Sequence, residues 1–136
     1  MYPPELVAPM KTDLTGVGFE ELITAEDVDQ AIGSPGTVLV VLNSVCGCAA
    51  GSMRPAVKLA VQHNKVPGKL TTAFAGVDRD AVDRARKFML PYPPSSPSIA
   101  LFKDGKLVHM IERHHIEGRT AEMIAENLQM AFDEHC

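Results

Sequence analysis

The segment that indicates the fold of this chain is Val38-Leu39-Val40-Val41-Leu42-Asn43-Ser44-Val45-Cys46-Gly47-Cys48-Ala49-Ala50-Gly51. It begins with five apolar residues that do not alternate with polar ones, a pattern typical of a strand buried on both faces of a sheet. Two cysteines follow this strand, and a helical spacing of apolar residues begins after them at Met53. The segment therefore predicts a strand, a sharp turn that carries two thiols, and the N-terminus of a helix.

The two cysteines lie where the expected helix begins, and Cys46 is the predicted nucleophile. A helix N-terminus carries partial positive charge and unpaired N–H groups, so a sulfur placed there is stabilised as the thiolate. The thiolate is the reactive form of cysteine. The motif therefore predicts thiol–disulfide exchange, with Cys48 either as the resolving thiol or as a neighbour that tunes the charge of Cys46.

The spacing of the two cysteines limits the kind of thiol chemistry. Cys46 and Cys48 are two residues apart, which places them about 200° apart around a helix. A disulfide between them requires the backbone to leave helical geometry at Gly47, which glycine permits, and the bond would be strained and easily reduced. The pattern favours an isomerase or an enzyme that removes small thiols over a general reductant.

Composition and length exclude several classes of protein. With 136 residues, 46% of them hydrophobic and 22% charged, the chain is predicted to form one domain over residues 1–136. The net charge of −4, with scattered Lys and Arg, argues against a nucleic-acid partner, and no apolar run is long enough to cross a membrane. The sequence shows no signal peptide, so the expected compartment is the cytoplasm, where cysteines seldom form structural disulfides.

Apolar periodicity and turn residues predict the remaining elements. Pro55 belongs to the first turns of the helix after the cysteines or kinks it, and Asp104-Gly105 predicts a hairpin turn. From residue 36 the order is β-α-β-α-β-β-α, which requires parallel strands with a right-handed crossover and then an antiparallel hairpin. The expected helices are 3–12, 24–32, 49–64, 81–89 and 121–132, and the expected strands are 37–42, 70–77, 98–102 and 107–111.

The chain resembles the thioredoxin-like fold at three independent places. These are the cysteine at the junction of a core strand and a helix, the proline that opens the strand from Ser98, and the amphipathic C-terminal helix. The resemblance implies an α/β fold with three α/β/α layers and a central mixed sheet of about four strands. Residues 1–35 would form a helical N-terminal extension and residues 36–136 the core. It also implies a cis bond before Pro97, with Ser96 presenting its backbone to a disulfide-bonded substrate.

The chain further resembles the bacilliredoxins in motifs that cover most of its length. The resemblance implies reduction of mixed disulfides between cytoplasmic proteins and bacillithiol, the low-molecular-weight thiol of bacteria that lack glutathione. Bacillithiol would be a co-substrate rather than a cofactor, and disulfide isomerase activity is also attached to the family. The matching motifs are Leu14-Thr15-Gly16-Val17-Gly18-Phe19-Glu20-Glu21-Leu22, Asn43-Ser44-Val45-Cys46-Gly47-Cys48-Ala49-Ala50-Gly51, Pro94-Ser95-Ser96-Pro97-Ser98, Arg113-His114 with Ile116-Glu117-Gly118, and Phe132-Asp133-Glu134-His135-Cys136.

Other polar residues are weaker candidates for the site. Arg113 or His114, after the last strand, could stabilise the thiolate or bind the carboxylates of bacillithiol, or could belong to a solvated loop. Arg54 is a weaker candidate of the same kind. Cys136 is either an exposed bystander or an additional redox thiol. No catalytic role is expected for His63, His109 or His135.

A metal-binding module is the alternative function. Cys46, Cys48, Cys136 and His135 would supply three thiolates and one imidazole, a ligand set that suits zinc. Cys-x-Cys pairs are less usual than Cys-x₂₋₄-Cys pairs in zinc sites, and the chain holds no second Cys-x-x-Cys pair. We therefore expect redox chemistry and no bound metal.

Overall fold

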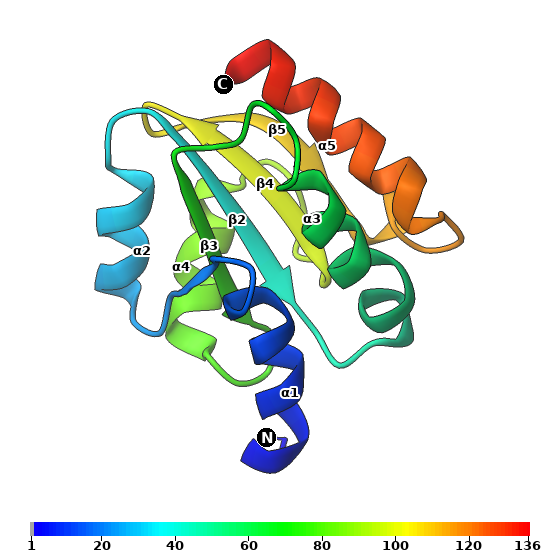
Figure 1. Cartoon of the computed structure of the whole chain (residues 1–136). Helices are drawn as coiled ribbons and strands as arrows, with labels where there is room; N and C mark the ends of the chain where they lie inside the picture. The colour runs from blue at the N-terminus through cyan, green and yellow to red at the C-terminus, as the bar shows by residue number, and fades with distance from the viewer. Residues whose placement is uncertain (1) are drawn as a thin grey trace.

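The computed structural model describes residues 2–136 of the chain (Figure 1). No helix in this part of the chain is both long and apolar enough to cross a membrane. In chain order the elements are α1 (Pro4–Thr15), β1 (Glu20–Glu21), α2 (Ala25–Ile32), β2 (Thr37–Asn43), the π-helical turn η1 (Ala49–Met53), α3 (Arg54–Ala60), β3 (Lys69–Phe74), α4 (Arg79–Phe88), β4 (Ser98–Lys103), β5 (Lys106–Ile111), the 3₁₀ turn η2 (Arg113–His115) and α5 (Ala121–His135).

A five-stranded mixed sheet in the order β1-β3-β2-β4-β5 forms the centre of the molecule. β3 runs parallel to β2, whereas β4 is antiparallel to both β2 and β5. α3 packs against α5 on one face of the sheet, and α2 packs against α4 on the other (Figure 1). The predicted three-layer α/β/α fold with a mixed central sheet is confirmed.

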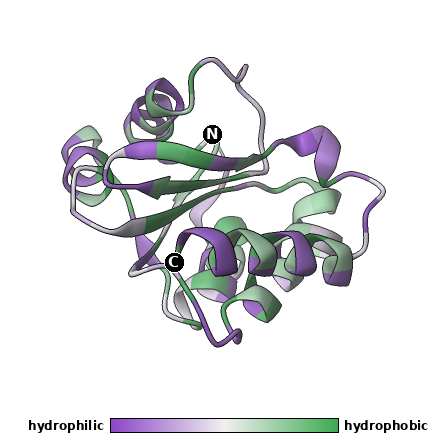
Figure 2. Ribbon diagram, turned by 90° about the horizontal axis from the view of Figure 1, so that it is seen from above, coloured by the Kyte–Doolittle hydropathy of each residue, from purple (hydrophilic) through white to green (hydrophobic). Residues whose placement is uncertain are grey.

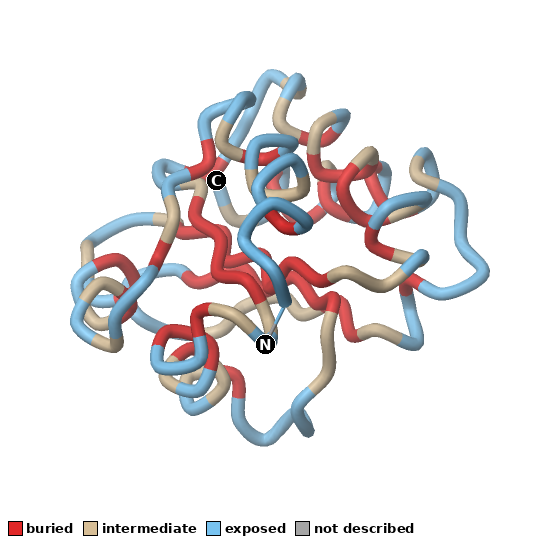
Figure 3. Tube along the Cα trace, turned by 90° about the horizontal axis from the view of Figure 1, so that it is seen from below, coloured by how far each residue is buried: buried red, intermediate tan, exposed pale blue. Residues whose placement is uncertain are grey.

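β2 is the central strand and is buried on both faces, as its apolar sequence predicts. Leu39 and Val41 pack into the cluster under α3 and α5, and Val38, Val40 and Leu42 pack into the cluster under α2 and α4. Figure 2 shows the apolar strands between two layers of helices, and Figure 3 shows burial concentrated in the sheet and the inner sides of the helices. The two-sided core holds the end of β2 in a fixed position.

The N-terminal 35 residues are more closely integrated than a purely helical extension. Glu20 and Glu21 form β1, which pairs in parallel with Thr71 and Thr72 of β3 and adds a fifth strand to the sheet. Two acidic residues in a row carry no strand signal, so this edge was not predicted. Phe19, just before β1, is buried in the core cluster under α3 and α5.

Two predicted elements end earlier than the periodicity indicated. The expected helix 49–64 is a π-helical turn followed by α3, which begins with Pro55 in its first turn and ends at Ala60. A proline lacks the N–H that the preceding helical turn would use, and this lets the hydrogen-bond pattern change there. The expected strand 70–77 ends at Phe74, because a turn follows in which Gly76 has φ 84° and Val77 donates to the Phe74 carbonyl.

Two local structures are each specified by a few neighbouring residues, and the first is the predicted hairpin turn. The β4–β5 hairpin turns at Asp104 and Gly105, whose φ angles of 51° and 81° are the left-handed conformation that an Asp-Gly pair favours. Thr24 caps α2 by accepting the Asp27 N–H at 3.0 Å, and the Asp27 carboxylate accepts the Thr24 N–H in return.

Phe132 of α5 is fully buried in the core cluster, whereas Met130 on the same helix is 65% exposed. We expect Phe132→Ala to lower the free energy of unfolding by about 3–5 kcal/mol, because it removes apolar contacts and leaves a cavity. Met130→Ala should change it by less than about 0.5 kcal/mol. Urea unfolding followed by circular dichroism measures both, and equal effects of the two substitutions would contradict the packing of α5.

Candidate active site

The two cysteines of the motif lie in the loop that joins β2 to η1, and both are partly exposed. Their sulfurs are in contact, 2.6 Å apart, and no disulfide bond joins them. The backbone N–H of Cys48 also points to the sulfur of Cys46, at 3.4 Å. The turn therefore places a thiol and a backbone donor against one sulfur, that of Cys46.

Arg113 supplies a positive charge to this sulfur from the other side of the site. Its Nη2 donates to Cys46 Sγ at 3.2 Å, and its Nη1 donates to the Ser96 carbonyl at 3.2 Å. Its Nε donates to Glu117 at 2.7 Å, which fixes the third edge of the guanidinium. One side chain thus contacts both the nucleophile and the segment before β4.

The two thiols have opposite pKa shifts. The pKa of Cys46 is lowered mainly by the hydrogen bond from the Cys48 thiol, and further by the Cys48 N–H and the charge of Arg113, while burial opposes this. The pKa of Cys48 is raised mainly by its burial, then by the hydrogen bond and the negative charge of Cys46. The site therefore favours ionisation of Cys46 before that of Cys48, with the Cys48 thiol as the donor to the Cys46 thiolate.

The segment before β4 completes the site. Ser98 pairs with Leu42 near the end of β2, so Ser96 and Pro97 lie beside the loop that carries the cysteines. The Ser96–Pro97 bond is cis, as the resemblance to the thioredoxin-like fold implies, and Pro97 is buried while Ser96 is partly exposed. The structure thus brings together Cys46, Cys48, Ser96, Pro97 and Arg113.

A buried polar network supports the loop from below. The Arg54 side chain is 5% exposed, and its Nη1 donates to Asn43 Oδ1 at 3.1 Å and to the Ser44 carbonyl at 2.8 Å. Ser44 Oγ in turn accepts the Cys46 N–H at 3.0 Å. Its contacts show that Arg54 holds the backbone of the loop, whereas the sequence suggested it as a partner of the thiolate.

The sequence reasoning missed Asn43 and Ser44 as supporting residues. Asn43 accepts the Ser44 N–H at 2.8 Å and donates through Nδ2 to the Met10 carbonyl of α1 at 3.0 Å. A signal was present, because two polar residues at the end of a fully apolar strand need buried partners. The identity of those partners, on α1 and α3, depends on the fold.

His114 lies apart from the cysteines. Its side chain is 68% exposed, its Nε2 is 3.8 Å from Glu112, and its ring packs against that of His115 at a centroid distance of 4.0 Å. A role for His114 in binding bacillithiol stays a prediction. Arg113 and His114 are neighbours in the chain, and the 3₁₀ turn directs only the first of them to Cys46.

Cys136 lies at the far end of the α3 and α5 pair from the active site. Ser52 of η1 donates to the Arg119 carbonyl just before α5, whereas His63, after α3, binds Asp133 near the end of α5. The fifteen residues of α5 span about 22 Å between these two contacts. A redox role for Cys136 stays a prediction, without a contact to Cys46 within one chain.

The alternative zinc site is contradicted by this arrangement. Cys46 and Cys48 lie near the start of α5, and His135 and Cys136 lie at its end, so the four ligands are not brought together (Figure 1). Within residues 2–136, the structure brings one group of three metal-ligating side chains close together, and it contains none of those four residues. That group is Glu112, His114 and His115.

Comparison with known proteins identifies the family. The family model described as "Disulphide isomerase" matches residues 2–136. A bacilliredoxin of Cytophaga hutchinsonii is 60% identical over 134 residues, which is 98% of this chain and 99% of the relative. The chain belongs to the bacilliredoxin family. A second bacilliredoxin, from Koribacter versatilis, is 52% identical over 137 residues and is covered over 94% of its length.

Solved structures support the fold of this bacilliredoxin-family chain. Oxidized mitochondrial thioredoxin 3 from Saccharomyces cerevisiae superimposes with a TM-score of 0.59 at 16% identity, over 90% of this chain and 98% of that one. At this identity the likeness shows the thioredoxin fold alone. Together with the family and the geometry of Cys46, it makes the protein a thiol–disulfide oxidoreductase.

The hydrogen bond from Cys48 and the charge of Arg113 both hold the pKa of Cys46 down, and they can be separated by substitution. We expect Cys48→Ala and Arg113→Met each to move the midpoint of Cys46 reactivity to higher pH, with the larger change for Cys48→Ala because its thiol is the main cause. The rate of alkylation by iodoacetamide, measured against pH in a Cys136→Ala background, reports this midpoint.

The control for these variants is Arg79→Met on α4, which removes an arginine from the opposite face of the sheet. It should leave the midpoint of Cys46 unchanged. If Arg113→Met also left the midpoint unchanged, or lowered it, the contact between its guanidinium and the Cys46 sulfur would have no electrostatic effect on the nucleophile.

Proposed function

We propose that this protein removes bacillithiol from S-bacillithiolated proteins, with Cys46 as the nucleophile. The observation that carries the proposal is the Cys46 sulfur, which accepts hydrogen bonds from Cys48 and Arg113 and is still partly exposed. Relatives that are 60% and 52% identical over nearly their whole length are named bacilliredoxins. The site supports attack on a disulfide, and the relatives support the identity of the small thiol.

The first step is an exchange between one thiolate and one mixed disulfide. The Cys46 thiolate attacks the bacillithiol sulfur of the modified protein. A Cys46–bacillithiol disulfide forms, and the disulfide bond between bacillithiol and the substrate protein breaks. The protein leaves as its thiolate, so the number of disulfide bonds and electrons is conserved. Ser96, next to the cis bond, offers its backbone to the substrate segment on this side of Cys46.

The second step removes bacillithiol from Cys46, and the geometry favours Cys48 as one route. Once Cys46 is bonded to bacillithiol its negative charge is gone, and with it a cause of the raised pKa of Cys48. Arg113 then faces Cys48 without a competing thiolate. Cys48 attacks Cys46, a Cys46–Cys48 disulfide forms and bacillithiol leaves as a thiolate; a thiol reductant must then supply two electrons to return this disulfide to two thiols. Alternatively, a second bacillithiol attacks the Cys46–bacillithiol disulfide and leaves as bacillithiol disulfide, which frees Cys46 directly.

The partners of this cycle are cytoplasmic proteins with modified or disulfide-bonded cysteines, and a low-molecular-weight thiol. Bacillithiol is consumed or released as a co-substrate, so the cycle needs no resident cofactor. The sites in this proposal are catalytic Cys46 and Cys48, substrate-binding Ser96 and Pro97, and Arg113 beside the reacting sulfur.

The decisive experiment uses a bacillithiolated protein and single cysteine variants. We expect Cys46→Ala to abolish adduct removal, because the Cys48 N–H and the Arg113 guanidinium contact the sulfur of Cys46 and not that of Cys48. Cys48→Ala should remove the adduct more slowly and accumulate a Cys46–bacillithiol disulfide, which mass spectrometry detects and added bacillithiol resolves. Cys136→Ala serves as the matched control and should behave as the unsubstituted protein. Wild-type rates for Cys46→Ala would refute the proposal.

Disulfide isomerase activity is a second candidate, favoured by the description of the matching family. Isomerisation needs one nucleophile that attacks a wrong disulfide and is released when the correct one forms. We therefore expect Cys48→Ala to retain a large part of the reactivation of scrambled ribonuclease, and Cys46→Ala to lose it. An absence of reactivation by the unsubstituted protein would exclude this second activity.

A further inference from the structure

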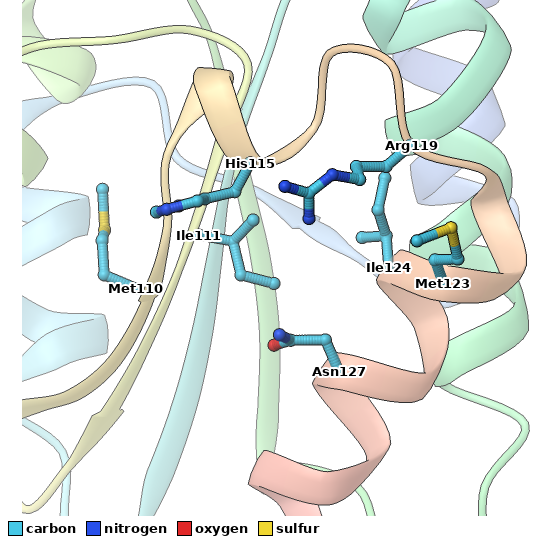
Figure 4. A pocket seen from close by; sticks show the side chains of 7 residues that line it. All are labelled: Met110, Ile111, His115, Arg119, Met123, Ile124 and Asn127. Atoms are coloured by element: carbon cyan, nitrogen blue, oxygen red, sulfur yellow. The ribbon is translucent and has the colours of Figure 1, made fainter.

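A pocket with a volume of about 200 Å³ lies between β5 and α5, next to the loop that carries Arg113. Ile111 and Ile124 form its apolar floor, Arg119 and Asn127 extend toward it from the side of α5, and the His115 ring lies on the Met110 side (Figure 4). None of its seven lining residues is acidic. The volume is below the range of about 300–1,000 Å³ that is typical for drug-sized ligands, so it suits a small fragment.

The polar groups of this pocket are donors. His115 Nδ1 accepts the Glu112 N–H at 3.3 Å, so the proton of the neutral ring is on Nε2. Asn127 Oδ1 accepts a hydrogen bond from His109 Nε2 at 2.7 Å, and the amide N–H groups of Asn127 take no part in that bond. Such a pocket is complementary to a group that only accepts hydrogen bonds.

Arg119 gives the pocket its charge. Among the described residues 2–136, no carboxylate forms an ion pair with its guanidinium, whereas Arg84 and Arg113 are each paired. A guanidinium in a pocket that two further donors also line matches a carboxylate, which offers four lone pairs and a negative charge. The apolar floor fits the short carbon chain between two carboxylates.

The pocket and the nucleophile are joined through one loop. Arg113 contacts the Cys46 sulfur, and His115 is two residues further along the chain. The Cα atoms of Arg113 and His115 are therefore at most about 7.6 Å apart. The Arg119 carbonyl accepts Ser52 Oγ at 2.9 Å, which ties the opposite rim of the pocket to the turn after Cys48. This loop therefore carries both the arginine that contacts the Cys46 sulfur and one side of the pocket.

We infer that this pocket binds the malyl dicarboxylate of bacillithiol, and that His115, Arg119 and Asn127 select the small thiol that reacts at Cys46. The inference rests on the proposed function and names the part of the thiol that the protein recognises. In the reaction concerned, the bacillithiol thiolate attacks the Cys46–bacillithiol disulfide, bacillithiol disulfide leaves and Cys46 is released as the thiolate.

A kinetic experiment separates recognition of the carboxylates from reactivity of the sulfur. The Cys46–bacillithiol adduct is prepared in a Cys48→Ala background, and its release is measured with bacillithiol and with the uncharged thiol 2-mercaptoethanol. We expect Arg119→Met to slow the reaction with bacillithiol about tenfold, through loss of charge-assisted hydrogen bonds, and to leave that with 2-mercaptoethanol unchanged. Arg79→Met, on the other face of the sheet, should alter neither rate.

A binding experiment tests the pocket without any redox step. Malate titrated into the unsubstituted protein should produce saturable amide shifts in ¹H–¹⁵N spectra at residues 111–127, and the uncharged diamide of malate should produce none. Arg119→Met should abolish the shifts, and so should Asn127→Asp, which keeps an acceptor for His109 and adds a negative charge to the rim.

The outcomes of these experiments distinguish failure of the pocket's role from failure of the proposed function. Equal slowing of both thiols by Arg119→Met, or no slowing of either, would overturn the role of the pocket while leaving removal of bacillithiol intact. An absence of malate shifts at the pocket would overturn it as well. If the unsubstituted protein bound malate but did not remove bacillithiol from proteins, the proposed function would fail, and with it the assignment of the pocket to bacillithiol.

Discussion

The buried guanidinium of Arg54 is the interaction on which the geometry of the active-site loop depends. It binds Asn43 at the end of the central strand and the Ser44 carbonyl in the loop, and its Nε lies 3.4 Å from Asp13 of α1. Burial of a cation is costly unless it is paired and hydrogen-bonded, so the loss of any of these contacts would destabilise the loop. α1, β2 and α3 are therefore held in one arrangement directly below Cys46.

Two arginines have different roles at the site: one supports the loop and the other contacts the reacting sulfur. Arg54 comes from below, is buried, and binds oxygens of the loop backbone and of Asn43. Arg113 comes from the segment after β5, is 43% exposed, and binds the sulfur itself. Burial suits the first because its partners never change. Exposure suits the second, because its partner changes charge when Cys46 reacts.

Much of the fold was predictable because its signals are local. The apolar run of β2, the Asp104-Gly105 turn and the Thr24 cap each specify their structure within a few residues. β1 was not predictable, because two glutamates form a strand only where the edge of β3 is available to them. Apolar periodicity also does not predict the early end of the helix after the cysteines, since the apolar spacing continues beyond Ala60.

The site was predictable in its nucleophile and only partly in its surroundings. The position of Cys46 after a buried strand is a local signal, whereas the partner on the facing loop is not. Arg113 and His114 were equal candidates by sequence, and a single 3₁₀ turn directs the first to the sulfur and the second to solvent. The zinc alternative failed for a related reason, because the ligand types were suitable but α5 holds them apart.

The contact between the two thiols imposes an order on their ionisation. While Cys46 is a thiolate, its charge and its hydrogen bond keep the proton on Cys48, so only one nucleophile is offered to a substrate. Once Cys46 is part of a disulfide it no longer has that charge, and the acceptor that held the Cys48 proton is gone. Arg113 remains in place beside both sulfurs and then favours the second thiolate over the first. In a Cys-Gly-Cys turn, two thiolates can in this way attack in succession, and one arginine stabilises each in turn. This holds although the two cysteines are closer in sequence than those of Cys-x-x-Cys.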